Sequence, residues 1–286
     1  MSKTRIGILL LALALMAMTV DKPAYQIYNV KGKKTTYNNM LKDIMGCEVV
    51  LFGELHDNPI SHWLELQVAK DLFKLKKQDL VLGAEMFETD NQNALDKYLK
   101  GEITQDTLKK QARLWKNYPT DYKPLVDLAK NTNLKFVATN IPRKYATMVM
   151  KAGFDTLNML SAAEKKLMAA LPIEFDGELP QYKSMLTMDS SHSSPNLPKA
   201  QAIKDATMAS FIQANYTQGK LFLHFNGSYH SDFFEGIMWY LKKKNPDMRI
   251  LTISTVEQDD IGKLSTDNIM AADYIICVPE DMTKTY

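Results

Sequence analysis

The chain has 286 residues, of which 45% are hydrophobic and 24% charged, so it can bury a sizeable core, and this composition is typical of a globular and not a disordered chain. Its formal net charge is +2, and a form without the basic N-terminal residues Lys3 and Arg5 would carry 33 basic and 33 acidic residues. This balance argues against a nucleic-acid-binding protein.

The N-terminus has the pattern of a secretory signal peptide. Lys3 and Arg5 precede an apolar stretch over 6–17 that contains several small residues. About 12 apolar residues are fewer than the roughly 20 that span a bilayer, which favours a cleaved signal over a membrane anchor. We therefore expect residues 1–19 to be removed and the protein to be exported to the periplasm or cell envelope. No lipobox cysteine stands near the expected cleavage site.

The remaining chain, residues 20–286, is predicted to form a single α/β domain with a mainly parallel sheet flanked by helices. A short strand is expected over 25–30, and later apolar runs predict strands over 48–52, 80–85, 134–139, 220–226, 249–254 and 274–278. Amphipathic segments of helical length separate most of these runs. This alternation is typical of parallel strands with helices on both faces of the sheet.

Local signals add detail to this pattern. Asp57, Asn58 and Pro59 offer cap residues and a proline for the start of the helix that follows the strand over 48–52. Between about 155 and 218 only helical pattern occurs, broken by prolines, which predicts a helical insertion, or lid, before the fourth core strand. Within it, the Ser-rich stretch over 190–195 is predicted to be a mobile loop.

Polar residues close the apolar strands in a way that predicts one pocket. Ligands of parallel α/β sheets bind beyond the carboxyl ends of the strands. Two Gly-x-x-His motifs stand at such ends, Gly53-Glu54-Leu55-His56 and Gly227-Ser228-Tyr229-His230. The candidate pocket residues, which come from four strands, are Glu54, His56, Glu85, Asn140, Arg143, Asn226 and His230.

Several of these residues have structural alternatives. Glu54 and His56 are two positions apart, so in extended backbone they point the same way, as an acid-base pair or a metal pair needs, but either could be a hydrogen-bonded turn residue. Glu85 closes an apolar run, where a carboxylate needs a partner, so both a functional role and an ion pair with Arg143 stay open. If a divalent metal is bound, Glu54, His56 and His230 are expected to hold it.

The other histidines and the cysteines have simpler interpretations. His224 is expected to be a buried core residue of its strand, and His62 a packing residue of its helix. Cys47 and Cys277 border or lie in apolar runs, where a buried thiol is as natural as a disulfide. The sequence contains no His-Glu-x-x-His, Gly-x-x-x-x-Gly-Lys, Gly-x-Gly-x-x-Gly or Gly-x-Ser-x-Gly motif, so standard zinc-protease, nucleotide-binding and serine-hydrolase functions lose their main support.

Six segments together carry a family resemblance. They are Gly53-Glu54-Leu55-His56-Asp57-Asn58, Ala84-Glu85-Met86-Phe87, Trp115 with Tyr118 and Tyr122-Lys123-Pro124-Leu125, Asn140-Ile141-Pro142-Arg143, Gln201 through Asp205 to Ala209, and Gly227-Ser228-Tyr229-His230. Over about 25–257, the chain resembles the ChaN-like haem-binding uptake proteins, which are related to the Tiki and TraB proteins and to erythromycin esterases. The first segment is the most specific of the six.

The resemblance implies haem binding outside the cytoplasm. It also implies a homodimer in which two haems stack face to face in a shared pocket, with each iron held by tyrosine, and a link to outer-membrane haem uptake machinery. No tyrosine aligns with the family's ligand, so the iron-ligand candidates are Tyr118, Tyr122, Tyr182 and Tyr229. A hard phenolate holds ferric iron well, as transport requires.

Two functions are therefore open. The first is haem binding for uptake or scavenging, in which Arg143 or a lysine pairs with the haem propionates. The second is hydrolysis of an ester or amide, in which His56 and His230, with Glu54 and Glu85, activate water while Arg143 stabilises an oxyanion. A metal bound by the same residues would make the hydrolase metal-dependent.

Overall fold

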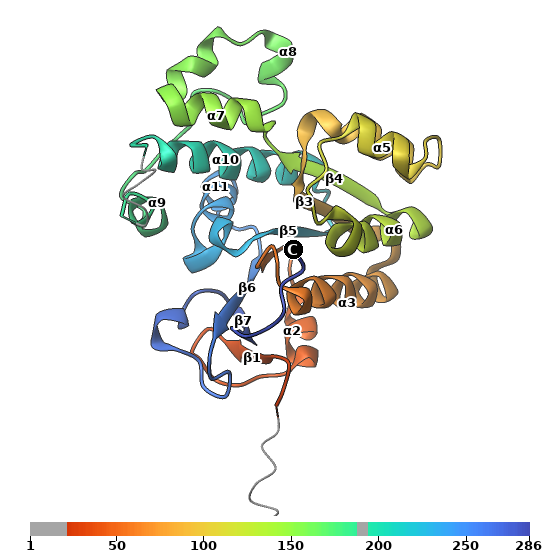
Figure 1. Cartoon of the computed structure of the whole chain (residues 1–286), viewed down its shortest axis with the longest axis vertical. Coiled ribbons are helices and arrows are strands. Elements are labelled where there is room, and N and C mark those ends of the chain that lie inside the picture. The colour runs from red at the N-terminus through yellow and green to blue at the C-terminus, as the bar shows by residue number, and fades with distance from the viewer. Residues whose placement is uncertain (1–21, 188–193) are drawn as a thin grey trace, which may run out of the picture.

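The computed structural model describes residues 22–187 and 194–286, whose strands form one seven-stranded sheet in the order β1-β7-β6-β2-β5-β3-β4 (Figure 1). The strands are β1 Gln26–Asn29, β2 Val49–Glu54, β3 Leu80–Glu88, β4 Lys135–Asn140, β5 Leu221–Gly227, β6 Ile250–Gln258 and β7 Tyr274–Pro279. Every neighbouring pair is parallel except β1 and β7. The predicted mainly parallel α/β fold is confirmed.

The strand β3 differs from its prediction in a way that matters for the site. It was expected to end at Glu85 but extends to Glu88. Its pairing with β4 is irregular between Ala84 and Glu88, where Glu88 lies opposite Asn140. Irregular stretches of this kind re-aim side chains at the end of a strand. Glu85 therefore lies where the regular ladder has stopped, and its side chain is free to turn towards β5.

Helices cover both faces of the sheet. They are α2 Tyr37–Ile44, α3 Pro59–Lys76, α4 Gln92–Leu99, α5 Gln105–Gln111, α6 Lys123–Thr132, α7 Arg143–Ala152, α8 Ala162–Lys165, α9 Pro180–Ser184, α10 Leu197–Asn215 and α11 Ile237–Lys244. Alternate side chains of each strand point to opposite faces. Val50 and Phe52 of β2 pack in the cluster that contains α2 to α6, whereas Val49 and Leu51 pack with α10 and α11.

The start of α3 agrees with the sequence signals. The Asn58 side chain accepts hydrogen bonds from the backbone N–H groups of Ile60 and Ser61, and Pro59 occupies the first helical position. The Asn58 amide also donates to Glu257 of β6 over 3.2 Å. These bonds connect the first turn of α3 to the sheet, immediately after the first Gly-x-x-His motif.

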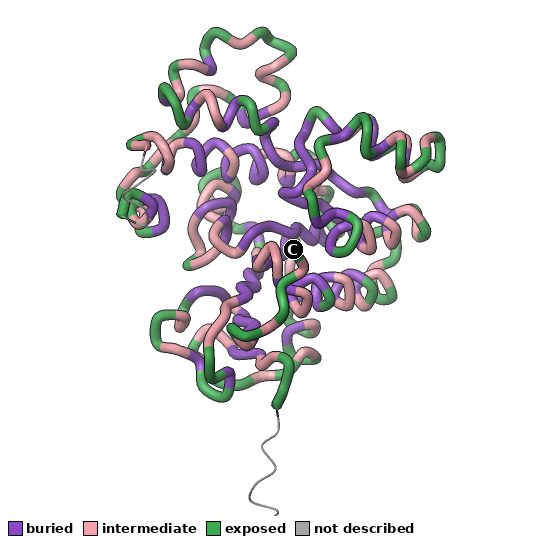
Figure 2. The backbone as a smooth tube through the Cα atoms, viewed as in Figure 1, coloured by how far each residue is buried: buried purple, intermediate pink, exposed green. Residues whose placement is uncertain are grey.

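The described part of the stretch between β4 and β5 contains helices and no strand, as expected, although residues 166–179 form turns and irregular backbone, and it is not all insertion. Met208, Ala209 and Ile212 of α10 pack on the sheet together with α11, so α10 is the crossover helix that leads into β5. Figure 2 shows the strands and α10 as the most deeply buried parts of the fold. Only the residues before α10 lie off the sheet. Most of the Ser-rich loop, residues 190–193, lies outside the described residues.

The two cysteines and the C-terminal end of the chain lie within the described residues, but the N-terminal end does not. The predicted signal peptide, residues 1–19, lies outside the described residues. Within the described part of the chain, no helix combines the length and apolarity needed to cross a bilayer. Cys47 and Cys277 are free thiols. After β7 the chain returns to the middle of the molecule (Figure 1), where the Thr285 N–H donates to the Asp57 carbonyl over 2.9 Å.

Candidate functional site

The sheet places the two Gly-x-x-His motifs side by side. β2 and β5 are neighbouring parallel strands, and Gly53 pairs with Asn226 while Glu54 pairs with Gly227. Both strands therefore end at the same edge, and both motifs turn away from it together. Two segments far apart in sequence thus form one site.

The glycines of the motifs are required by close packing. A Cβ atom at Gly227 would lie 2.8 Å from Cε1 and Nε2 of the His56 ring. A Cβ atom at Gly53 would lie 2.8 Å from the Ile253 carbonyl oxygen and 2.9 Å from Cα of Ser228. Each glycine makes room for a part of the opposite motif. The spacing of the motif thus reflects the packing of one turn against the other.

His56 is the open half of the site. Its Nδ1 donates to Glu54 Oε1 over 2.6 Å, and its ring packs edge-on against Trp115 at 4.8 Å between centroids. The side chain is 35% exposed. Burial opposes its protonation, but the Glu54 and Glu85 carboxylates outweigh this and raise the pKa of His56. With Nδ1 occupied by Glu54, Nε2 is the nitrogen left for a ligand.

His230 is the buried half. Its Nδ1 lies 2.5 Å from Asp205 Oδ1, and its Nε2 lies 3.1 Å from Glu85 Oε1. Glu85 Oε2 accepts the Gly227 N–H over 2.8 Å. Burial disfavours the imidazolium, yet the two carboxylates prevail and raise the pKa of His230 to about 9. His230 is therefore a cation that joins β3, β5 and α10.

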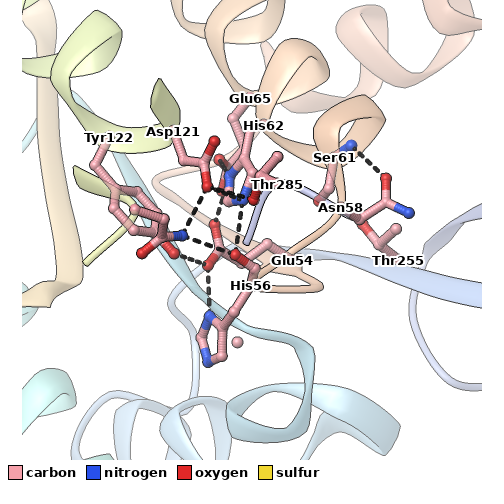
Figure 3. A network of polar contacts seen from close by, with 12 residues as sticks. Glu54, His56, Asn58, Ser61, His62, Glu65, Asp121, Tyr122, Thr255 and Thr285 are labelled. Carbon is pink, nitrogen blue, oxygen red and sulfur yellow. Dashed lines mark hydrogen bonds and ion pairs between the residues drawn. The ribbon is translucent and has the colours of Figure 1, made fainter. Parts of the chain in front are cut away.

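A second buried cluster lies behind His56 (Figure 3). Nδ1 of His62 is 3.2 Å from Glu54 Oε2 and 3.0 Å from Glu65 Oε2, and its Nε2 is 3.0 Å from the His56 carbonyl oxygen and 3.5 Å from Asp121 Oδ2. Burial opposes the charge, but Glu54 and Glu65 raise the pKa of His62 to about 11. Burial and the neighbouring Glu54 raise the pKa of Glu65 well above its usual range.

A cavity of about 710 Å³ opens at this edge of the sheet. Its apolar wall consists of Leu114, Trp115, Ile141 and Ala146. Its polar lining residues are His56, Glu85, Glu88, Arg113, Lys116, Asn117, Asn140, Arg143, Lys204, His230 and Tyr286. Arg113 is ion-paired with Glu88 and Asp90. The cavity therefore combines an apolar wall with an excess of basic side chains.

Most of the predicted pocket residues meet in this cavity. His56, Glu85, Asn140, Arg143 and His230 line it. Glu54 does not line it, because its side chain lies behind His56 and accepts hydrogen bonds from His56 and Tyr122. Asn226 is fully buried and does not line it either, because its amide donates to the Gly227 carbonyl and the Ser231 hydroxyl.

Geometry decides the partner of Glu85 and agrees with the prediction for His224. The partner of Glu85 is His230, and no ion pair joins Glu85 to Arg143 among the described residues. His224 is buried as expected, and its ring contacts the Thr139 hydroxyl at 2.7 Å and Asn226 Oδ1 at 3.0 Å. Burial lowers the pKa of His224 to about 4, so it is neutral.

The four tyrosine candidates lie outside the cavity lining. Tyr118, Tyr122 and Tyr182 are each at most 2% exposed. The Tyr122 hydroxyl donates to Glu54 over 2.7 Å, and the Tyr182 hydroxyl donates to Asp205 Oδ2 over 2.8 Å. Tyr229 is half-buried and donates to the Gln181 carbonyl over 2.6 Å. The tyrosine that does line the cavity is Tyr286, 56% exposed.

Several site residues were missed or misjudged from sequence. His62 was expected to be a packing residue, which is wrong because its two ring nitrogens lie within 3.5 Å of three carboxylates. Asp205 of α10, which holds His230, lies in a segment that carries the family resemblance, but it was not predicted as a site residue because a single acidic residue in a helix carries no motif. His62 and Glu65 could have been found from their spacing, since residues three apart on a helix are neighbours and this face of α3 also carries buried Val68 and Leu72.

Comparisons with known proteins agree with this description. The family model described as haem-binding uptake, Tiki superfamily, ChaN matches residues 40–241. No curated protein gives a match.

Solved structures share the fold. ChaN of Campylobacter jejuni, described for cofacial heme binding, superposes with a TM-score of 0.65 at 18% identity, covering 88% of this chain and 96% of that one. A mutant erythromycin esterase in its open conformation gives a TM-score of 0.51 at 10% identity over 90% and 97% of the two chains. A protein from Bacillus cereus gives 0.50 at 11% identity over 90% and 95%. At these identities the likeness concerns the fold alone.

The packing of the glycines gives a first prediction. Gly227→Ala should keep the fold but push the His56 ring away from Glu54, because the ring is a partly exposed side chain that can move. Gly53→Ala should unfold the protein at lower temperature, since its clash is with backbone. Nitrogen NMR shifts of the His56 ring and thermal denaturation measure the two effects. Gly46→Ala, whose Cβ would lie at an ordinary contact distance of 3.5 Å from the Asp43 carbonyl oxygen, is the control. An unmoved His56 ring in Gly227→Ala would contradict the packing argument.

His230 gives a prediction on pH. Its folded pKa of about 9 exceeds the usual 6.5, so its stabilising charge is fully present below pH 6.5 and is lost as the pH rises through 9. A shift of this size corresponds to roughly 3 kcal/mol of unfolding free energy. Urea denaturation should therefore show a fall in stability from pH 7 to pH 10 that is smaller in His230→Gln. A ring-nitrogen NMR titration of the wild type with a midpoint below pH 7 would refute this.

Proposed function

The chain belongs to the ChaN family of haem-binding uptake proteins in the Tiki superfamily, and we propose that it binds haem in the cavity at the carboxyl edge of its sheet. The observation that carries this proposal is the composition of the cavity. Trp115, Leu114 and Ile141 offer apolar surface suited to a porphyrin face. Basic side chains stand beside that surface, as a planar ligand with two carboxylates requires.

The basic residues are available for the propionates. Lys116, Arg143 and Lys204 line the cavity and have no ion-pair partner among the described residues. Arginine binds a carboxylate through two parallel hydrogen bonds, and lysine binds it as a point charge. The Glu85 charge within the same cavity is already matched by His230. An anionic ligand would therefore meet a net positive lining.

The iron ligand is proposed from the residues that reach the cavity. His56 offers Nε2, because its Nδ1 is held by Glu54, and Tyr286 offers an exposed phenol. Both an imidazole and a phenolate are known axial ligands of haem iron. The four tyrosines suggested by the family resemblance stay candidates only if the protein rearranges, since Tyr122 and Tyr182 already donate to buried carboxylates.

The proposal extends to where and how the protein acts. The N-terminal pattern supports export to the periplasm or cell envelope, and the family membership supports a role in haem uptake or scavenging. We expect a haem in this cavity to keep one face uncovered by its own protomer. A second haem-bearing protomer would cover that face, which is the dimer that the family resemblance implies.

Titration with hemin tests the proposal. We expect a saturable Soret shift at micromolar hemin, and elution as a dimer in size-exclusion chromatography after loading. The triple variant Lys116→Gln, Arg143→Gln, Lys204→Gln should bind about tenfold more weakly per lost propionate contact, since a hydrogen bond to a charged group contributes at least ~1.5 kcal/mol. Tyr286→Phe and His56→Ala should identify the ligand by the spectrum of the ferric form.

A matched control separates site binding from nonspecific attraction of hemin to positive charge. Lys100, Lys109 and Lys151 are exposed and lie outside the cavity lining, so their triple glutamine variant should bind hemin as the wild type does. Equal weakening in both triple variants, or no saturable Soret shift in the wild type, would overturn the proposal.

A second candidate function is hydrolysis, and one observation favours it. His56 donates Nδ1–H to a buried carboxylate at 2.6 Å, and its Nε2 has no hydrogen-bond partner among the described residues, which is how a general base is held. Arg143 and Lys204 lie in the same cavity and could stabilise an oxyanion.

A panel of ester and amide substrates, with and without added metal, tests this second function. Turnover should fall by about 100-fold or more in His56→Ala, the usual scale of general-base catalysis, and should rise with pH as His56 loses its proton. Turnover that survives in His56→Ala, or none on any substrate, would exclude the mechanism.

A further inference from the structure

The cluster behind His56 carries more negative charge than its one histidine can match. His62 is surrounded by the carboxylates of Glu54, Glu65 and Asp121, and each of these four side chains is at most 5% exposed. One imidazolium compensates one carboxylate. Isolated buried carboxylates are costly, so a further positive charge, from protons or from a metal ion, must be present.

The hydrogen bonds of His62 determine which of its nitrogens could face a metal. Its Nε2 lies 3.0 Å from the carbonyl oxygen of His56, which can only accept, so Nε2 carries a hydrogen. In the neutral ring, Nδ1 then presents a lone pair towards Glu54 and Glu65. An N–H bound to a carbonyl or carboxylate on the far side is the usual support of a metal-ligating histidine.

The oxygens of the cluster are also placed for a metal. Glu54 Oε2 and Glu65 Oε1 have no hydrogen-bond partner among the described residues, although Glu54 is 1% exposed and Glu65 is fully buried. Nδ1 of His62 is 3.2 Å from Glu54 Oε2 and 3.0 Å from Glu65 Oε2. Ligand atoms of a tetrahedral zinc ion, each about 2.0–2.1 Å from the metal, lie roughly 3.3 Å apart.

We propose that Glu54, His62 and Glu65 bind one divalent transition-metal ion, with Zn²⁺ as the best fit to one imidazole and two carboxylates. The second oxygen of Glu65 is available to complete the coordination. This set shares only Glu54 with the Glu54, His56 and His230 set expected from sequence. The metal would lie behind the haem cavity, and its binding would not require haem.

The site has a connection to the cavity through Glu54. Its Oε2 faces the proposed metal, while its Oε1 accepts hydrogen bonds from His56 Nδ1 and the Tyr122 hydroxyl. A metal on one oxygen would fix the plane of the carboxylate. The ring of His56 would then be oriented by an ion that it does not touch.

Calorimetric titration of haem-free, EDTA-dialysed protein with zinc chloride tests the proposal. We expect one equivalent of Zn²⁺ to bind with a micromolar or smaller Kd, and the Tm to rise with zinc concentration. Co²⁺ should bind in its place and give visible absorption bands that report its coordination. Because no haem is present, failure of this experiment is distinct from failure of haem binding.

Two variants test whether the zinc ion binds at the proposed residues. Glu65→Gln keeps the size and shape of the side chain, so it should fold, but it should lose roughly a hundredfold or more in Zn²⁺ affinity and lose the cobalt bands, since even an outer-sphere partner is worth 10- to 100-fold. His56→Gln should retain Zn²⁺ binding, because Glu54 Oε2 is untouched.

Other results would overturn the assignment. Equal Zn²⁺ binding by the wild type and Glu65→Gln, or no binding by either, would mean that the cluster is neutralised by protons. Loss of binding in His56→Gln, with Glu65→Gln unaffected, would place the ion on the histidines of the Gly-x-x-His motifs instead.

Discussion

The site depends on the pairing of buried carboxylates with histidines. Glu54, Glu85 and Asp205 are withdrawn from water at the carboxyl edge of the sheet. Each lies within 3.2 Å of an imidazole nitrogen. Because an unmatched buried carboxylate costs several kcal/mol, the histidines cannot move without a large loss of stability. The turns, the close glycine contacts and the crossover helix α10 keep each carboxylate at hydrogen-bond distance from its histidine.

The paired histidines of the two motifs have different roles. His230 is surrounded by carboxylates from β3 and α10 and has a 6% exposed side chain, so it fastens those elements to β5. His56 has one carboxylate partner, an aromatic neighbour and a 35% exposed side chain. The same Gly-x-x-His pattern therefore places a histidine that connects structural elements in one motif, His230, and a histidine that lines the cavity in the other, His56. The difference arises from what packs around each ring.

Sequence predicted the parts of this molecule that depend on local pattern. The apolar runs located every strand, the cap residue Asn58 located the start of α3, and the motifs located the edge where the pocket lies. Partners brought by tertiary packing were not predictable in this way. Asp205 and His62 lie in helices whose pattern looks like ordinary packing, and only the strand order reveals that they converge on β2 and β5. The irregular end of β3, which re-aims Glu85, has no sequence signal of its own.

The strand order has a consequence for how the protein folds. β2 stands between β5 and β6, so its neighbours in the sheet come from the second half of the chain. Pairings between such distant segments form slowly. The chain loses conformational entropy when the long loop closes, and this loss precedes the favourable contacts between the strands. Until β5 arrives, Glu85 lacks His230, the imidazolium with which it forms its ion pair. The site should thus be among the last parts of the domain to form, and an N-terminal fragment that ends before β5 would lack it altogether.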